Sequence, residues 1–431
     1  MNAVFMTIVS VAFLVAAVRQ IMWSGAADAS PMAALGKAMI DAATGSVTLA
    51  LGLVGVMALF LGLMKVAEAG GLLVIIAKTL RPLLVRLFPD VPADHPAMGA
   101  MILNMAANVL GLGNAATPFG IRAMQQLDSL NPNKGTASDS MALFLAINTS
   151  SITLLPTGVI ALRAAAGSTD PAGIVPTTLF ATICSTAVAI FMAKFLARRW
   201  PAPRGVVAET ENTTVEITAD EPEGDWTEAG TGAYPVWVSV TALAVVATLV
   251  PLTIVYGRSI APWIVPGIMV GLLSFGWLRK VPVYESFVEG AKDGFNVALR
   301  IIPYLVAILV AVGMFRASGA MDLIVSPLGA ITGAIGLPAD ALPMALLRPL
   351  SGSGAYGILA SIIQDPAIGP DSYVGYLVST FQGSTETTFY VLAVYFGAVG
   401  IRRIRHALVA ALCADVAGIA AAVFIVGVLY G

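Results

Sequence analysis

Two clusters of neutral polar residues interrupt apolar stretches in the first half of this 431-residue chain. The first contains Asn104, Asn108 and Asn114, and the glycines Gly111 and Gly113 stand between the last two asparagines. Asn104 and Asn108 are four residues apart, so they share one face of a helix. Glycine lets the backbone turn and leaves its N–H and C=O groups free for a ligand. The cluster therefore predicts either a binding site for a polar solute or a glycine-rich packing contact in which amides bond across helices.

The second cluster is Asn148, Thr149 and Ser150, and Pro156 follows it closely. Its amide and hydroxyl groups both donate and accept hydrogen bonds. These residues could bind a polar solute. They could equally satisfy the backbone at a helix break beside the proline, and the sequence leaves both interpretations open.

The second half carries two charged clusters, one around Arg348 and one around Glu386. Arginine keeps its charge in proteins, and placing it in hydrocarbon costs at least ~2.5–3.5 kcal/mol on insertion scales. Arg348 therefore needs a partner, and Glu386 is the natural one. A carboxylate inside a membrane is a functional-site hypothesis because protonation can switch its charge, and the alternative is a purely structural ion pair. The other binding candidates in these clusters are Ser351, Ser353, Gln382, Ser384 and Thr385.

Asp415 lies inside the last apolar stretch of the chain. With Glu386 it is a candidate for coupling transport to protons or cations, although it could instead bond a neighbouring helix. No catalytic residues are predicted, because the chain has no nucleophile elbow, no Walker phosphate loop and no zinc-protease helix. Two cysteines and two histidines predict no metal site, and no cofactor is expected.

The elements that position these clusters must be membrane helices. The chain is 58% hydrophobic and 11% charged, with a mean hydropathy of +0.87, whereas a soluble domain carries about 25% charged residues. A chain this apolar cannot cover itself with polar surface, so the lipid bilayer is its predicted partner. No basic patch indicates nucleic acid, and a homo-oligomer is compatible with the sequence.

A helix that crosses the bilayer needs about 20 apolar residues. The candidate spans are 4–23, 46–64, 173–197, 236–256, 260–278, 297–315 and 406–429. Four further apolar segments are interrupted by Gly, Pro, Asn or Ser, namely 96–114, 139–165, 341–363 and 372–400. Interrupted backbone at membrane depth is tolerated only where protein or water shields it. These segments therefore predict broken or re-entrant helices.

An acidic segment, 201–234, divides the chain into two stretches that resemble each other, 1–200 and 235–431. The acidic run is typical of a solvated linker. Val91–Asp94 and Leu337–Asp340 share the sequence Pro-Ala-Asp and occur at similar positions in the two stretches. The chain is thus predicted to hold two related repeats joined by a linker.

Basic residues predict that the two repeats are inverted. Arg198 and Arg199 follow the last helix of the first repeat, whereas Arg402 and Arg403 precede the last helix of the second. Because Lys and Arg stay cytoplasmic, these two helices should point in opposite directions across a cell inner membrane, with the linker in the cytoplasm. Inverted repeats with broken helices are typical of secondary transporters, whose solute site lies between the repeats.

Several long motifs resemble known families. Residues 1–200 resemble spore maturation protein A in Phe88–Pro96, Asn104–Pro118 and Asn148–Ser151. Residues 235–431 resemble spore maturation protein B in Val281–Lys292, Arg348–Gly354 and Gly383–Tyr390. The resemblance implies a fusion of the two, and both belong to the group that carries the nucleoside-recognition, or gate, domain. It does not identify a substrate.

Together these observations predict an all-α polytopic membrane protein with two inverted gate-type repeats and broken or re-entrant helices. The expected function is that of a secondary transporter or channel-like protein that binds a small polar or anionic solute between the repeats. The alternative is a non-transporting membrane scaffold or regulator in envelope or spore-type maturation. A water-accessible cavity lined by both halves would favour transport, and a dry, fully paired Arg348–Glu386 contact would favour the scaffold.

Overall fold

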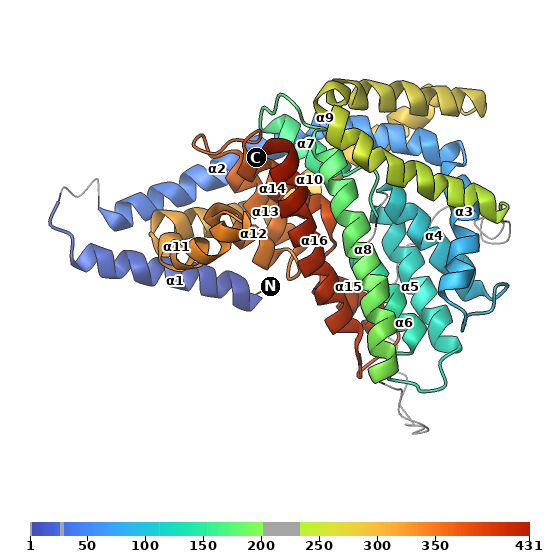
Figure 1. Ribbon diagram of the computed structural model, residues 1–431. Helices are drawn as coiled ribbons and strands as arrows, with labels where there is room; N and C mark the ends of the chain where they lie inside the picture. Colours follow the sequence, from blue (N-terminus) through green and yellow to red (C-terminus); the bar gives the residue numbers. More distant parts are fainter. Residues whose placement is uncertain (1, 26–29, 112, 151, 201–232) are drawn as a thin grey trace.

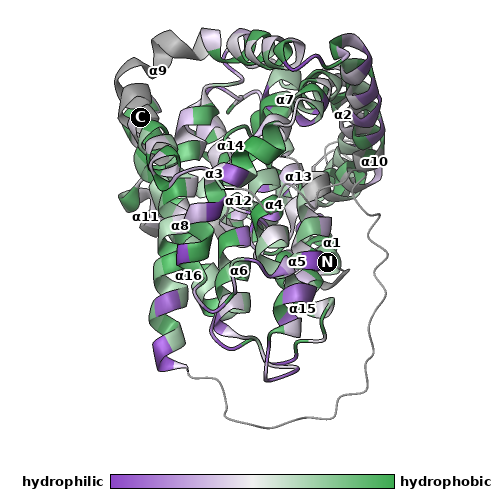
Figure 2. Cartoon of the chain, turned by 90° about the vertical axis from the view of Figure 1, so that its right-hand side faces the viewer, coloured by the Kyte–Doolittle hydropathy of each residue, from purple (hydrophilic) through white to green (hydrophobic). Residues whose placement is uncertain are grey.

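The computed structural model describes residues 2–25, 30–111, 113–150, 152–200 and 233–431. Apart from one isolated bridge between Thr136 and Arg403, all regular structure in these residues is helical. Hydrophobic residues cover most of the helices in Figure 2. The predicted acidic linker, 201–234, lies outside the described residues except for its last two positions.

Figure 1 shows how the helices of the two halves are arranged. The helices of the first half are α1 (Asn2–Ile21), α2 (Pro31–Ala69), α3 (Leu72–Leu87), α4 (Pro96–Leu110), α5 (Gly113–Ser129), α6 (Asp139–Thr149), α7 (Thr157–Ala165) and α8 (Ile174–Arg199). Those of the second half are α9 (Val236–Leu278), α10 (Val283–Ala317), α11 (Ala320–Thr332), α12 (Leu342–Leu347), α13 (Gly352–Ile363), α14 (Tyr373–Ser384), α15 (Thr388–Gly397) and α16 (Ala407–Tyr430), with short 3-10 turns at Gly333–Ile335 and Ala339–Ala341.

The order of helix lengths repeats from α2–α8 to α10–α16. Each series begins with a long helix, of 39 residues in α2 and 35 in α10, and ends with one of 26 residues in α8 and 24 in α16. Between them lie a shorter helix and two pairs of helices that are each interrupted by a break. The predicted internal repeat is therefore visible in the succession of helices.

The last helices of the two series, α8 and α16, run antiparallel along each other. Tyr430 at the end of α16 donates a hydrogen bond of 2.8 Å to the carbonyl of Gly173, which precedes α8. At the opposite end Arg405, just before α16, donates to the carbonyl of Trp200, just after α8. The first long helices are antiparallel too, because Gly62 packs against Phe287 near the start of α10 and Gly313 packs near Ala42. Corresponding helices thus point in opposite directions, as predicted.

The helix breaks have local causes. Gly111 ends α4 with φ +76°, a left-handed conformation that glycine adopts without steric cost. Pro156 stands at the start of α7, where its fixed φ and missing N–H suit a chain that is not yet helical. Ser351 caps α13 by accepting a hydrogen bond of 3.0 Å from the Gly354 N–H. The four interrupted segments of the sequence correspond to α4–α5, α6–α7, α12–α13 and α14–α15.

Three described helices are long and apolar enough to cross a membrane, α2, α8 and α16, and a bent pair, Pro327–Ile335 with Ala339–Leu347, would make a fourth. The predicted spans 236–256 and 260–278 lie in one helix, α9, which Figure 1 shows sharply bent into two arms. Pro262 does not end that helix. Predicted spans 46–64 and 297–315 are parts of the longer helices α2 and α10, which pack together through glycines such as Gly290 and Gly294.

The core consists of two main clusters, and each contains residues of both halves. One packs α3–α6 against α15 and α16, with Phe144 and Phe396 among its buried members. The other packs α2 and α7 against α10, α13 and α14, with Ile160 and Leu359 among its members. The repeats are therefore interleaved, and neither one packs as a separate body.

Buried arginines tie the halves together at both ends of the fold. At one end Arg405 bonds Asp139 at the start of α6 at 2.7 Å. At the other end Arg163 near the end of α7 bonds Asp371, just before α14, at 3.0 Å. Since α6 and α14 are corresponding helices of the two repeats, the inverted architecture places a similar arginine–aspartate contact at each end.

Candidate functional site

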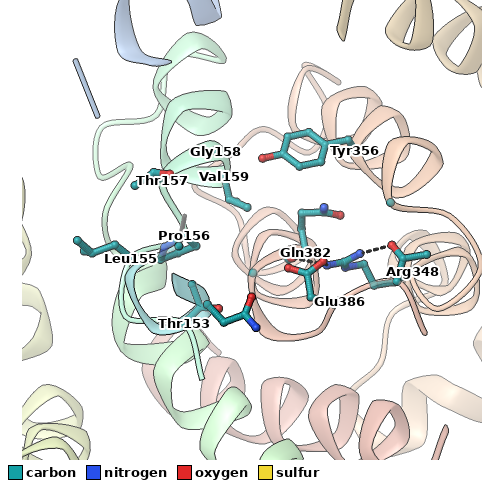
Figure 3. Close-up of a pocket in the computed structure, with 15 residues that line it drawn as sticks. Thr153, Leu155, Pro156, Thr157, Gly158, Val159, Arg348, Tyr356, Gln382 and Glu386 are labelled. Carbon is teal, nitrogen blue, oxygen red and sulfur yellow. Dashed lines mark hydrogen bonds and ion pairs between the residues drawn. The ribbon is translucent and has the colours of Figure 1, made fainter. Parts of the chain in front are cut away.

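The four helix breaks meet at one cavity of about 300 Å³ between the two halves (Figure 3). The break between α4 and α5 and the break between α6 and α7 provide one wall, and the breaks in α12–α13 and α14–α15 provide the other. The lining residues are Asn108, Gly111, Thr153, Leu155, Pro156, Thr157, Gly158, Val159, Arg348, Gly352, Tyr356, Gln382, Gly383, Glu386 and Thr387. All of them lie at these breaks or within a helical turn or so of one.

Arg348 follows α12 directly, and its guanidinium spans the second-half breaks. One terminal nitrogen, Nη1, donates to Thr387 Oγ1 at 2.9 Å. The other, Nη2, donates to the carbonyl of Gln382 at 3.2 Å and to the carbonyl of Thr385. The Arg348 side chain is only 5% exposed. Carbonyl groups that have no partner inside α14, at its end, accept most of the hydrogen bonds from the Arg348 guanidinium.

Glu386 stands in the break between α14 and α15. Its backbone N–H donates to the carbonyl of Thr149 at 2.8 Å, so the ends of α6 and α14 meet here. Its carboxylate lies 3.8 Å from Arg348 Nη2 and the side chain is 54% exposed. The predicted Arg348–Glu386 pair therefore exists, but it is a loose pair that opens to the cavity.

Tyr356 and Gly158 bring the two walls together on one side of the cavity. Tyr356 lies one helical turn after the start of α13, and its hydroxyl points toward α7 (Figure 3). A side-chain carbon at Gly158 would collide with this hydroxyl. The absence of a side chain at Gly158 therefore allows the tyrosine to reach the opposite half.

Asn108 lines the cavity, and among the predicted asparagines whose side chains the structure describes it is the one that does so. Its amide donates to Asn148 Oδ1 at 2.9 Å, which also accepts from Tyr395 at 3.3 Å. Asn104 lies deeper and donates to the Ala116 carbonyl and to the Tyr395 hydroxyl. Asn104 and Asn148 thus belong to a polar network behind the cavity that ties α4 and α6 to α15.

The serine and threonine candidates do not line the cavity, and most of them hold the breaks. Thr149 and Ser150 each bond the carbonyl of Ala146 in their own helix, and Ser384 bonds the carbonyl of Phe381. Ser351 caps α13, Thr385 contributes a carbonyl to Arg348, and Ser353 is exposed elsewhere. The side chain of Asn114 lies outside the described residues.

Asp415 is buried in α16, away from the cavity lining. One carboxylate oxygen accepts a hydrogen bond of 2.6 Å from Thr388 at the start of α15. The other oxygen, Oδ1, has no partner in the part of the chain that the structure describes. Thr388 follows Thr387, which bonds Arg348, so Asp415 is connected to the cavity through adjacent residues.

The predicted binding residues leave out two parts of the site. The segment from Thr153 to Val159 lines the cavity, and Pro156 with the following Gly158 was the signal that could have indicated it. Tyr356 lies four residues beyond Gly352 in the Arg348 cluster, but an aromatic residue in an apolar helix gives no sign of which way it points. The prediction did place Asn108, Arg348, Gln382 and Glu386 together.

Comparison with solved structures finds two chains that align with nearly all of this one at low structural and sequence similarity. A CNTnw double variant in an outward-facing state has a TM-score of 0.46 at 13% identity, covering 100% of both chains. The YdaH transporter of Alcanivorax borkumensis has a TM-score of 0.42 at 18% identity, covering 98% of this chain and 97% of that one. Likenesses of this size do not establish a shared mechanism.

Sequence comparison is more specific. The chain is 51% identical over 167 residues to spore maturation protein B of Bacillus subtilis, which covers 39% of this chain and 93% of that protein. It is 48% identical over 163 residues to spore maturation protein A of the same organism, covering 38% of this chain and 83% of that protein. These matches are consistent with a fusion of the two. Residues 50–166 and 298–402 match the Gate family, described as nucleoside recognition. Since these two regions make up half of the chain and contain most of the cavity, the chain belongs to the nucleoside-recognition Gate family.

Proposed function

We propose that this protein is a secondary transporter or channel-like protein of the cell inner membrane that binds a small polar solute between its two gate repeats. The observation that supports this most directly is the convergence of four helix breaks, two from each inverted repeat, on one cavity. Inverted repeats move relative to each other around such a site in alternating-access transport. The membrane helices and the family match support a transporter-like role in general, without specifying the solute.

The state of the Arg348–Glu386 pair favours transport over the scaffold. In a scaffold the ion pair would be fully paired and shielded from water, because an incompletely paired buried charge lowers stability and contributes nothing to assembly. Here the Glu386 side chain is 54% exposed and stands 3.8 Å from Arg348. The pair lines a cavity large enough for a small solute, since ligand pockets begin at roughly 300 Å³.

Helix breaks also supply binding groups without side chains. The last C=O groups and the first N–H groups of a helix have no partners inside it. In this cavity Arg348 donates to the carbonyls at the end of α14, and Gly111 and Gly352 at two other breaks line the cavity. We therefore propose to test nucleosides first, because the family is described as nucleoside recognition, and to add amino acids and polyols as other small polar solutes.

The proposal is tested by flux into proteoliposomes that contain the full-length protein. Wild type should carry at least one labelled solute of that panel, and Glu386→Gln should abolish this flux while the melting temperature is retained. Glu285→Gln, the same chemical change at an exposed position of α10, should transport normally. Unchanged flux in Glu386→Gln would remove Glu386 from the mechanism, and wild-type liposomes that carry none of the solutes would favour the scaffold.

A further inference from the structure

We infer that the cavity selects a solute with no net charge that brings a hydrogen-bond donor, and that Glu386 is the residue that keeps anions out. This inference rests on the proposed function and narrows its substrate class. It is carried by the charges that line the cavity and by the hydrogen-bonding groups that remain free there. It narrows the predicted small polar or anionic solute to one that is neutral or zwitterionic.

The charges of the described lining residues cancel. Arg348 and Glu386 are the charged members of that set, and their closest charged atoms are 3.8 Å apart. An anion in the cavity would gain attraction from one group and suffer repulsion from the other at similar distances. A net-neutral solute avoids this conflict, and a zwitterion could place its two charges against the opposite partners.

Most of the hydrogen-bond donors of Arg348 are already engaged, which limits its ability to bind an anion. Tight carboxylate or phosphate binding by arginine uses two parallel N–H bonds from the guanidinium. In this structure both terminal nitrogens already donate, Nη1 to Thr387 and Nη2 to the carbonyls of Gln382 and Thr385. These bonds use three of the five guanidinium N–H groups, and the Nε–H and one Nη1–H have no partner among the described residues. The arginine can offer a solute a lateral donor, but its main fork serves the helix break.

Two buried groups of the described lining residues have no partner, the Arg348 Nε–H, which is a donor, and Gln382 Oε1, which is an acceptor. Gln382 Oε1 is buried, with the residue 7% exposed, and has no partner in the described part of the chain. Figure 3 shows this side chain between Glu386 and Tyr356, and the Glu386 carboxylate adds a second acceptor. A buried acceptor left without a partner costs about 1–3 kcal/mol. The Glu386 carboxylate, whose side chain is 54% exposed, can accept a hydrogen bond from a solute N–H or O–H, whereas an anion rich in acceptors offers it no donor.

The test measures binding to purified full-length protein in detergent, with inorganic phosphate as the anionic probe. Wild type and the control Glu285→Gln should not bind phosphate saturably. Glu386→Gln leaves one net positive charge in the cavity, so it should bind phosphate saturably, with a Kd at least about tenfold below the highest phosphate concentration at which wild type shows no saturation. The double variant Arg348→Gln with Glu386→Gln should lose this gain. Phosphate binding by wild type with an equal Kd, or no gain in Glu386→Gln, would overturn the inference.

A second variant keeps the inference falsifiable if Glu386→Gln does not fold. Gln382→Glu is nearly isosteric and leaves one net negative charge in the cavity, so it should bind methylammonium where wild type does not. Equal methylammonium binding by wild type and Gln382→Glu would contradict the charge-balance argument. These binding results do not depend on flux. If wild-type liposomes carry no solute while both variants behave as expected, transport fails and the selection rule stands.

Discussion

Replacement of Arg163 by methionine tests whether the buried ion pair at one end of the fold joins the two repeats. The Arg163 side chain is fully buried and lies 3.0 Å from the Asp371 carboxylate, whose side chain is 31% exposed. It also donates to the carbonyl of Pro370 at 2.6 Å and to that of Asp170 at 3.1 Å. Its guanidinium carbon stands 4.2 Å from the centre of the Tyr376 ring. One side chain thus fastens α7 to the loop before α14.

The expected cost follows from these contacts. Removing one partner of a buried ion pair costs about 3–5 kcal/mol. Methionine keeps the apolar stem, and water can reach the partly exposed Asp371 carboxylate, which favours the lower end, about 3 kcal/mol. Folded proteins have an unfolding free energy of about 5–15 kcal/mol. If this membrane protein has a similar value, Arg163→Met removes a large fraction of it.

The assay is equilibrium unfolding of purified protein in detergent, with Arg122→Met as the matched control. Arg122 is exposed on α5, so its replacement should change the unfolding free energy by no more than about 0.5 kcal/mol. The double variant with Asp371→Asn should show a coupling energy of at least about 1 kcal/mol. An Arg163→Met protein within 1 kcal/mol of wild type, or strictly additive variants, would refute the reasoning that this pair ties the halves together.

Three further predictions follow from single contacts. Burial alone would raise the pKa of Asp371, but hydrogen bonds from Ser168 and Thr169 and the charge of Arg163 outweigh it and hold the pKa below its ordinary value. The stability that the ionised Asp371 contributes is therefore present above the unfolded-state pKa of about 3.9 and is lost as the pH falls through the lower folded-state pKa. The melting temperatures of wild type and Asp371→Asn should therefore converge in that acid range. A constant difference between them down to about pH 3 would contradict this prediction. Gly158→Val should push the Tyr356 hydroxyl aside and fill part of the cavity, which should lower solute binding or flux at least about tenfold and change the stability by about 1 kcal/mol. The control Gly271→Val, at a position with open space around it, should leave binding unchanged. Equal binding by the two variants would place the solute elsewhere. After Cys184→Ser and Cys413→Ser, the pair Ser185→Cys and Gly418→Cys should form a disulfide on oxidation, seen by mass spectrometry. A Cβ at Gly418 lies 3.3 Å from the Ser185 Cβ, and a small separation of the helices brings it to the distance of about 3.5–4.5 Å typical of disulfides. Absence of this cross-link would contradict the close packing of α8 against α16 at their midpoints.

The positions of the helix breaks could be predicted because their causes are local. Gly111 supplies the left-handed turn that ends α4, and Pro156 and Ser351 stand where α7 and α13 begin. The pairing of Arg348 with Glu386 could also be predicted, because a charge in an apolar chain needs a partner of opposite sign. The continuity of α9 through Pro262 could not, since a proline breaks or merely bends a helix according to its surroundings.

The orientation of individual side chains was beyond the sequence. Asn104 and Asn108 share one helical face, yet Asn108 reaches the cavity while Asn104 bonds the Ala116 carbonyl and the Tyr395 hydroxyl. Tyr395 is 291 positions away from Asn104, so no local pattern could have paired them. Ser353 and Gln382 looked equally suitable as ligands, but one is exposed on α13 and the other lines the cavity.

The sequence by itself determined the membrane class, the repeated halves and the places where the helices break, because hydropathy and backbone preference act over a few turns of chain. Only the tertiary structure decided that four breaks meet at one cavity and that the cavity carries no net charge. The rotation of each helix about its axis is set by the helices packed against it, and most of those come from the other half. A break becomes a binding site only when its inverted counterpart is placed opposite it.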